Sequence, residues 1–208
     1  MKELLWMFIS LAILCIYSEA AKAQSDLSKV EVGAQFTLIH TSLNSTTEPG
    51  LGGRLTFNVT DHVALEAEVN FFPREDGVST NLTGGRITQG LFGVKAGKRF
   101  EKVGVFAKVR PGFISYGRTI TGVNANLPPP SGFQFGRTTY FAIDIGGVVE
   151  LYPSRRVIIR FDAGDTIIRY PAQDVPSPLQ VFPPPPPTHI PGFHKHNFQF
   201  SSGVGIRF

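Results

Sequence analysis

From residue 30 onward, apolar and polar residues alternate with a period of two in eight segments of the chain. This period is typical of β-strands, whose successive side chains point to opposite faces. In the third segment, Val63, Leu65 and Ala67 fall on one face, whereas Glu66 and Glu68 fall on the other. No segment shows a helical period, so the pattern predicts an all-β fold. The predicted strands span residues 30–40, 51–59, 63–71, 87–100, 103–113, 138–152, 157–170 and 196–208.

The connections between these strands alternate between short and long. The tight turns are residues 60–62, 101–102 and 153–156, and the long loops are residues 41–50, 73–86, 115–137 and 171–195. If neighbouring strands pair antiparallel, all the tight turns lie at one end of the sheet and all the long loops at the other. An even number of strands with this asymmetry is typical of an outer-membrane β-barrel.

Alternation alone does not say which face is inside. A soluble sandwich buries its apolar face, whereas a membrane barrel turns that face toward lipid. The apolar stretches have the 9 to 11 residues that a tilted strand needs to cross the hydrocarbon core. The polar face is rich in glycine, as a narrow lumen requires, and its positive and negative charges nearly cancel, as buried charges must. We therefore predict a lumen charge network of Arg54, Glu66, Glu68, Lys95, Arg99, Lys108, Arg110, Asp144, Glu150, Arg160 and Asp162.

Aromatic residues near the strand ends are expected at the two lipid–water boundaries, where aromatic belts gather. This predicts an outer belt of Phe71, Phe113, Tyr140 and Phe141 at the loop end, and a second belt of Phe100, Tyr152 and Phe208 at the turn end.

Composition excludes several other classes of protein. Hydrophobic residues make up 42% and charged residues 17% of the chain, which excludes a disordered chain and a coiled coil. The net charge of +4, without a basic–aromatic platform, gives no reason to expect a nucleic-acid partner. The mean hydropathy of +0.03 resembles that of a soluble protein, but here it averages a lipid-facing band and a charged lumen.

The N-terminus is typical of a secretory signal. Lys2 precedes an apolar run over residues 4–17, which is too short to span a membrane as a helix. Ala21 and Ala23 then supply the small residues that a signal peptidase reads. We predict a cleaved signal peptide over residues 1–23 and a barrel domain over residues 24–208. The single cysteine, Cys15, is lost with the signal, which excludes a disulfide and a cysteine nucleophile from the mature chain.

Two groups of residues are candidates for chemistry. His189, His194 and His196 share the last long loop and could bind Zn²⁺ or Cu²⁺, but no carboxylate completes the spacing. We favour a solvated polar loop, and we expect no metal and no cofactor. His40 and Ser42, at the loop end of the first strand, are the best candidates for a lipid-modifying activity. Because no nucleophile elbow accompanies them, we expect no enzymatic activity.

The last residues of the chain are the most specific feature of the sequence. Residues 201–208 place Gly203 and then Ile206 before a terminal aromatic residue, Phe208. This spacing matches the carboxy-terminal signal that the barrel assembly machinery of bacterial outer membranes reads. With the strands at residues 63–68 and 108–113, it resembles the small OmpA-like and OmpX-like barrels, the outer membrane protein beta-barrel domain family, over residues 26–208.

The resemblance implies an eight-stranded antiparallel up-and-down transmembrane β-barrel in the outer membrane of a Gram-negative bacterium. We expect a monomer surrounded by outer-membrane lipid, with both mature termini in the periplasm. The expected role is structural and interactive: supporting the envelope and presenting the loops to an external partner that the sequence does not identify. The alternatives are a lipid-A-modifying enzyme and a small gated pore.

Overall fold

The computed structural model describes residues 29–43, 45–74, 83–123, 133–175 and 188–208. The predicted signal peptide therefore lies outside the described residues. None of the described residues forms a helix long and apolar enough to cross a membrane. The strands of the described part are β1 (Val30–Thr41), β2 (Thr46–Asn58), β3 (Val63–Phe72), β4 (Thr83–Arg99), β5 (Val103–Val123), β6 (Phe133–Leu151), β7 (Val157–Tyr170), β8 (Gln173–Val175), β9 (Thr188–Ile190) and β10 (Phe193–Arg207).

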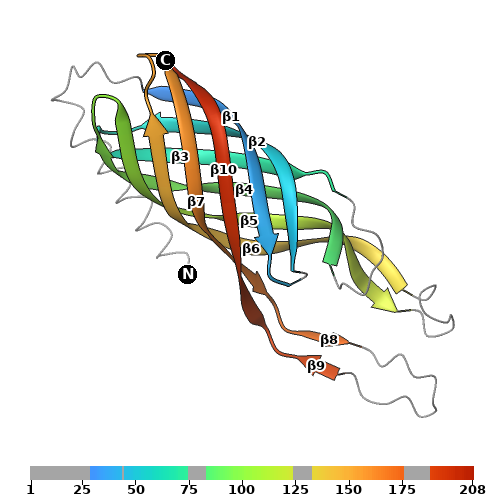
Figure 1. Ribbon diagram of the computed structural model, residues 1–208. Helices are drawn as coiled ribbons and strands as arrows, with labels where there is room; N and C mark the ends of the chain where they lie inside the picture. The colour runs from blue at the N-terminus through green and yellow to red at the C-terminus, as the bar shows by residue number, and fades with distance from the viewer. Residues whose placement is uncertain (1–28, 44, 75–82, 124–132, 176–187) are drawn as a thin grey trace, which may run out of the picture.

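Eight of the described strands close into one barrel in the order β1-β10-β7-β6-β5-β4-β3-β2 (Figure 1). All neighbours are antiparallel, and the barrel closes where β1 pairs with β10, with Glu31 opposite Arg207. Closure satisfies the backbone groups of both edge strands, which an open sheet would leave unpaired. The predicted eight-stranded antiparallel barrel is confirmed.

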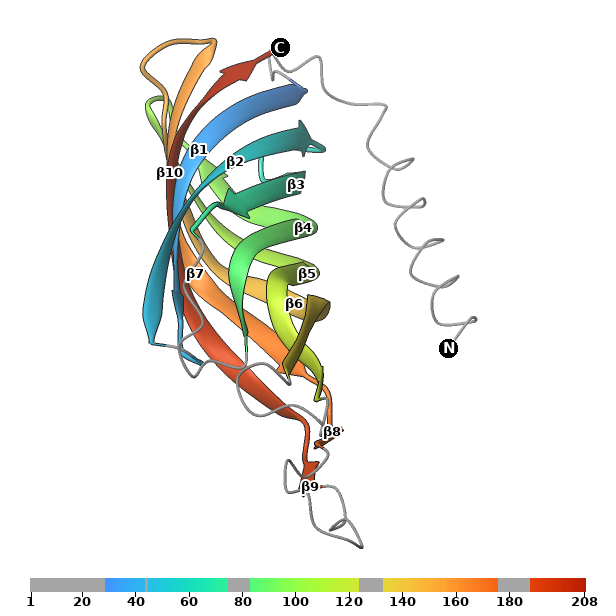
Figure 2. The same ribbon diagram turned by 90° about the vertical axis from the view of Figure 1, so that its right-hand side faces the viewer.

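The remaining two strands, β8 and β9, pair only with each other. They interrupt the connection from β7 to β10 and form a hairpin that lies beyond the barrel, at the end opposite the C-terminus (Figure 2). The prediction of a plain loop over residues 171–195 missed this hairpin.

Several strands are longer at the loop end than their alternation predicts. β2 begins at Thr46, and the predicted loop over residues 41–50 is instead mostly a β-hairpin, with Ser45 at a φ of 52° in its turn. β5 continues to Val123 and β6 begins at Phe133. Backbone ladder bonds extend these strands past the apolar region, because antiparallel pairing does not require an apolar side chain at every second position.

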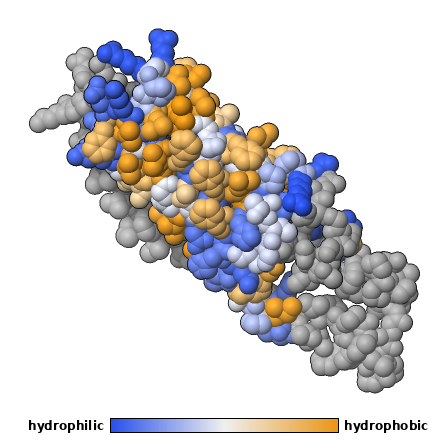
Figure 3. Space-filling view, viewed as in Figure 1, coloured by the Kyte–Doolittle hydropathy of each residue, from blue (hydrophilic) through white to orange (hydrophobic). Residues whose placement is uncertain are grey.

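The outer surface of the barrel is apolar and its interior is largely polar. Phe36, Leu51 and Phe92 are well exposed on the outside, whereas Glu66 and Arg110 are buried inside. Figure 3 shows the apolar side chains in a band over the barrel strands, with hydrophilic surface on either side. This arrangement inverts that of a soluble protein and suits a lipid environment.

Most of the predicted rim aromatics face outward, but two do not. Phe71, Phe113, Phe141, Phe100 and Phe208 are exposed. Tyr140 instead packs on the rings of Tyr116 and Tyr170, and Tyr152 lines a pocket at the turn end. The alternation of side chains along a strand explains why these two tyrosines differ from the prediction. Tyr140 precedes Phe141 and Tyr152 follows Leu151, and because both of these neighbours face outward, neither tyrosine can do so.

Candidate functional site in the barrel interior

The interior of the barrel is stacked in three layers, of which the one nearest the loops is apolar. Ile39, Ile114, Ala142 and Ile168 are completely buried there, and the ring of Tyr170 lies between Tyr140 and Phe193 at centroid distances of 4.7 and 5.0 Å. These side chains follow the same inward alternation as the charged residues further down the strands. Along the strands, the inward side chains therefore change from charged to apolar, while the same alternate positions continue to point into the barrel.

Below the apolar layer lies a belt of amide side chains. The Gln35 amide donates to Asn70 Oδ1 at 2.9 Å, and the Asn70 amide donates to Gln89 Oε1 at 2.8 Å. The Gln89 amide in turn donates to Gln199 Oε1 at 2.9 Å, which also accepts the Thr166 hydroxyl at 2.9 Å. These bonds link β1, β3, β4, β7 and β10 across the lumen. Sequence reasoning missed this belt, although all its members lie at the inward positions of predicted strands.

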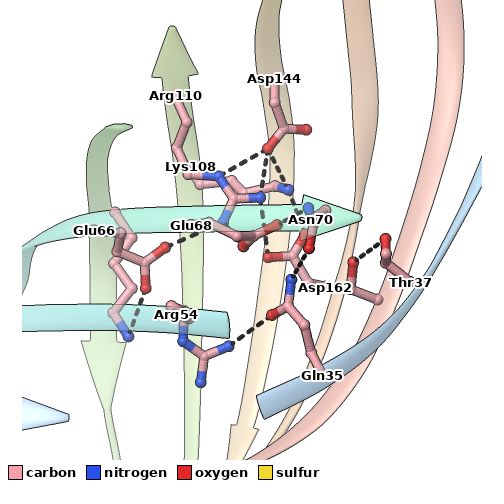
Figure 4. Close-up of polar contacts among 12 residues, drawn as sticks. Gln35, Thr37, Arg54, Glu66, Glu68, Asn70, Lys108, Arg110, Asp144 and Asp162 are labelled. Carbon is pink, nitrogen blue, oxygen red and sulfur yellow. Dashed lines mark hydrogen bonds and ion pairs between the residues drawn. The ribbon is translucent and has the colours of Figure 1, made fainter. Parts of the chain in front are cut away.

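The third layer consists of paired charges (Figure 4). Arg110 donates to Glu68 at 2.5 Å and, through Nη2 and Nε, to Asp144 Oδ2 at 2.6 and 2.9 Å. Lys108 donates to the same Asp144 oxygen at 2.6 Å and also binds Asp162. Two cations from β5 thus bind three carboxylates from β3, β6 and β7.

Arg160 extends this layer toward the turn end. Its Nη2 donates to Glu66 Oε2 at 2.9 Å and to Asp162 Oδ2 at 2.8 Å. Lys95 binds Glu150 and lies 3.4 Å from Glu66. Removing either partner of such a buried pair is costly because the remaining charge is left uncompensated. The network is therefore a cross-brace that joins five strands, β3 to β7, through the lumen.

The two remaining members of the predicted charge network lie on the same inward face but have fewer carboxylate partners. Arg99 donates to Asn58 Oδ1 at 2.6 Å and to Glu31 Oε1 at 3.2 Å, at the turn end. Within the described part of the chain, the buried Arg54 makes one long hydrogen bond, from Nη1 to Gln35 Oε1 at 3.4 Å.

The three candidate histidines are spread over two strands. His196 Nδ1 lies 2.5 Å from Asp165 Oδ2 on β7, and both side chains are exposed to solvent. His194 is exposed on the same outward face of β10, whereas His189 lies in β9. Within the described ranges, no three potential ligands come together in a metal-binding arrangement. The sequence around these histidines contains no carboxylate to complete a metal site. Asp165 on the neighbouring strand β7 supplies one, but it pairs with His196 alone.

His40 and Ser42 each have a different partner. His40 Nδ1 lies 3.1 Å from the Thr47 hydroxyl oxygen. The Ser42 hydroxyl donates to the backbone carbonyl of His196, and the Ser42 backbone N–H donates to Asn197 Oδ1 at 2.9 Å. The two side chains thus do not form the hydrogen-bonded pair that activates a serine nucleophile.

The predicted assembly residues lie at the closing seam of the barrel. Phe208 N–H donates at 2.8 Å to the carbonyl of Val30, the first residue of β1. Ile206 is exposed on the outer face, whereas a Cβ at Gly203 would lie 2.3 Å from the Ala34 carbonyl oxygen.

The comparison with solved structures finds small outer-membrane barrels that cover 86% of this chain. Neisserial surface protein A is 13% identical, with a TM-score of 0.49 and 96% of its chain covered. The N-terminal β-barrel domain of OprF from Pseudomonas aeruginosa is 15% identical, with a TM-score of 0.47 and 97% covered. Ail, the attachment invasion locus protein of Yersinia pestis, is 13% identical, with a TM-score of 0.49 and 96% covered.

No curated protein matches the chain. The family profile described as "Outer membrane protein beta-barrel domain" matches residues 8–208, which is nearly the whole sequence. The inverted barrel and the profile agree, and the chain belongs to the outer membrane protein beta-barrel domain family.

Proposed function

We propose that this protein is a structural and interaction protein of the Gram-negative outer membrane rather than a diffusion pore. The observation that carries this proposal is the filling of the lumen by an apolar layer, an amide belt and a paired-charge layer. An open diffusive channel is a property of barrels with about 16 to 18 strands, whereas an eight-stranded interior is filled by side chains. The barrel then serves as an anchor, and its function lies in what it presents at its ends.

The loop end is the surface that we propose to face outward. The barrel begins and ends at the opposite edge, where Glu31 of β1 lies across from Arg207 of β10. Periplasmic turns are short and external loops long in this class of barrel, which supports placing both mature termini in the periplasm. The assembly machinery would then read Phe208 from the periplasmic side.

The β8–β9 hairpin is the part of the described chain best placed to meet an external partner. It pairs with no barrel strand, and its register places Gln173 opposite Ile190 beyond the end of β7. His189 in this hairpin is exposed. A paired extension costs less conformational entropy on binding than an unstructured loop, because its backbone is already ordered.

The orientation can be tested by labelling cysteine variants with a membrane-impermeant maleimide. We expect His189→Cys to label in intact cells and Arg155→Cys, in the β6–β7 turn, to label only after the outer membrane is permeabilised. The reverse pattern would contradict the orientation.

The role can be tested by electrical recording and by binding. Purified barrel in planar bilayers is expected to give no conductance steps, and reproducible steps would overturn the non-pore proposal.

The hairpin can be tested by replacing residues 173–190 with a Gly–Ser turn. Cells that express this variant are expected to keep the barrel but to lose binding of the external partner at the cell surface. Lipid A masses that change when the protein is expressed would support the enzymatic alternative instead.

A further inference from the structure

At the turn end, below the paired-charge layer, the lumen opens into a pocket of about 960 Å³. Its inner end is formed by Glu31, Asn58 and Arg99, which are already joined by hydrogen bonds. Tyr152 and Arg207 form one wall, with the Arg207 guanidinium 3.9 Å from the centre of the Tyr152 ring. We call this pocket the vestibule. Because the layers above it are filled, a ligand would enter and leave it from the turn end only.

The vestibule carries more basic than acidic side chains. Its acidic side chains are Glu31 and Glu101. Its basic side chains are Arg99, Lys102, Arg155, Arg156 and Arg207. This excess of positive charge contrasts with the layer above, where cations and carboxylates are matched.

The excess cations come from separate parts of the chain and remain available. Among the described residues that line the vestibule, the ion pairs are those of Arg99 and Arg207 with Glu31, at 3.2 and 3.8 Å. Arg155 and Arg156 lie in the β6–β7 turn and Lys102 in the β4–β5 turn, and all three are exposed. The three groups thus come from two different turns, and Arg207 comes from the end of β10.

Among the residues that line the vestibule, buried donors without a hydrogen bond outnumber such acceptors. Arg99 Nε, Arg207 Nε and Arg207 Nη2 are buried and have no acceptor within the described part of the chain, against one buried acceptor without a donor, Glu31 Oε2. Buried donors are normally satisfied by protein, water or ligand. A cleft with low-dielectric walls concentrates the field of its charges, so an anion at this opening meets a strong positive potential.

We propose that the vestibule binds a soluble polyanion that carries two or more linked phosphate groups. Guanidinium groups form bidentate bonds with phosphate oxygens, and their fixed fork matches that geometry better than it matches a spherical ion. A pocket of about 960 Å³ with cations on separate turns is much larger than a single ion needs, so a linked oxyanion engages more of its cations at once.

Isothermal titration calorimetry on the folded barrel in zwitterionic micelles tests this proposal, with inorganic pyrophosphate and tripolyphosphate as probes. We expect saturable binding that is tighter for tripolyphosphate and weaker at higher salt. The double variant Arg155→Gln, Arg156→Gln should weaken binding by on the order of tenfold or more, because it removes two charge-assisted contacts. These residues lie in an exposed turn outside the barrel ladder, so the variant should fold.

The matched control is Arg118→Gln, Arg137→Gln, which removes the same charge from exposed positions near the loop end. Unchanged affinity in this control supports a site in the vestibule. Equal losses in both double variants would overturn the proposal in favour of general surface attraction, and so would the absence of saturable binding to the unmodified protein. A third outcome would also overturn it: no binding of either probe, with retention of phosphatidylglycerol by the barrel in nanodiscs, would assign the cations to a lipid surface.

Discussion

Arg54 and Glu68 lie directly opposite each other in the β2–β3 ladder, yet Glu68 binds a different arginine. Its carboxylate accepts from Arg110 at 2.5 Å and from the Asn70 amide at 2.7 Å. Arg54 turns toward Gln35, and its Nη2 lies 3.1 Å from where a Cβ on Gly33 would be. Arg54 is thus a buried cation whose neighbouring carboxylate, Glu68, is hydrogen-bonded to Arg110 and Asn70 instead.

This difference predicts unequal costs for two arginine substitutions. Arg110→Gln deprives Glu68 and Asp144 of a buried partner and should lower the free energy of unfolding by about 3–5 kcal/mol. Arg54→Gln removes a cation with one long polar contact and should cost much less. Urea unfolding in lipid vesicles measures both, with exposed Arg118→Gln as the control. An Arg54 variant as unstable as the Arg110 variant would contradict our account of the network.

Adjacent glycines in β6 provide a second test. A Cβ on inward-facing Gly146 would lie 2.2 Å from the Ala163 carbonyl oxygen, whereas a Cβ on outward-facing Gly147 would have its nearest neighbour, the Phe106 carbonyl oxygen, at 3.8 Å. Gly146→Ala must therefore push β6 and β7 apart, because the clash is with backbone. We expect reduced stability and a smaller heat-modifiable band on cold detergent gels for Gly146→Ala, and near-native behaviour for Gly147→Ala. Equal stability and equal gel migration of the two variants would argue against close contact between β6 and β7 at Gly146.

The sequence predicted the faces of the barrel much better than its internal contacts. Period-two alternation assigned Glu66, Arg160 and Asp162 to one face, because a strand fixes which side each residue points to. It could not pair Arg160 with Glu66, which lie 94 residues apart, since that contact depends on closure of the barrel. Strand ends were also missed, since Glu48 and Pro49 fall in the predicted loop over residues 41–50 but continue the ladder of β2.

Tyr152 predicts a specific response to alkaline pH. The residue follows β6, and burial together with the Glu150 carboxylate raises its pKa to about 12. An ordinary tyrosine has a pKa of about 10. The folded state therefore resists ionisation of this phenol, so its contribution to stability is complete below about pH 10 and is lost as pH rises toward 12. The absorbance titration of the folded protein minus that of Tyr152→Phe should show a midpoint near 12, and a difference midpoint near 10 would contradict the burial.

Phe208 lets assembly in the cell be separated from stability of the finished barrel. Its N–H donates to the Val30 carbonyl at the closing seam, while its side chain is exposed, with a relative accessibility of 72%. The exposed ring makes little contact with the folded barrel, so removing it should affect stability only slightly. If the ring is instead read during assembly, Phe208→Ala should sharply lower the amount of folded barrel in cells. The same variant, refolded from urea into micelles, should reach near-native stability.

Phe208→Tyr is the matched control for this variant, because it keeps an aromatic terminus. We expect it to restore normal amounts of barrel in the outer membrane, as judged by heat-modifiable migration. Normal cellular levels of Phe208→Ala would refute the proposed assembly signal. A variant that fails equally in cells and in micelles would show that the terminal ring acts through stability, since a purely kinetic role in recognition leaves the refolded barrel intact.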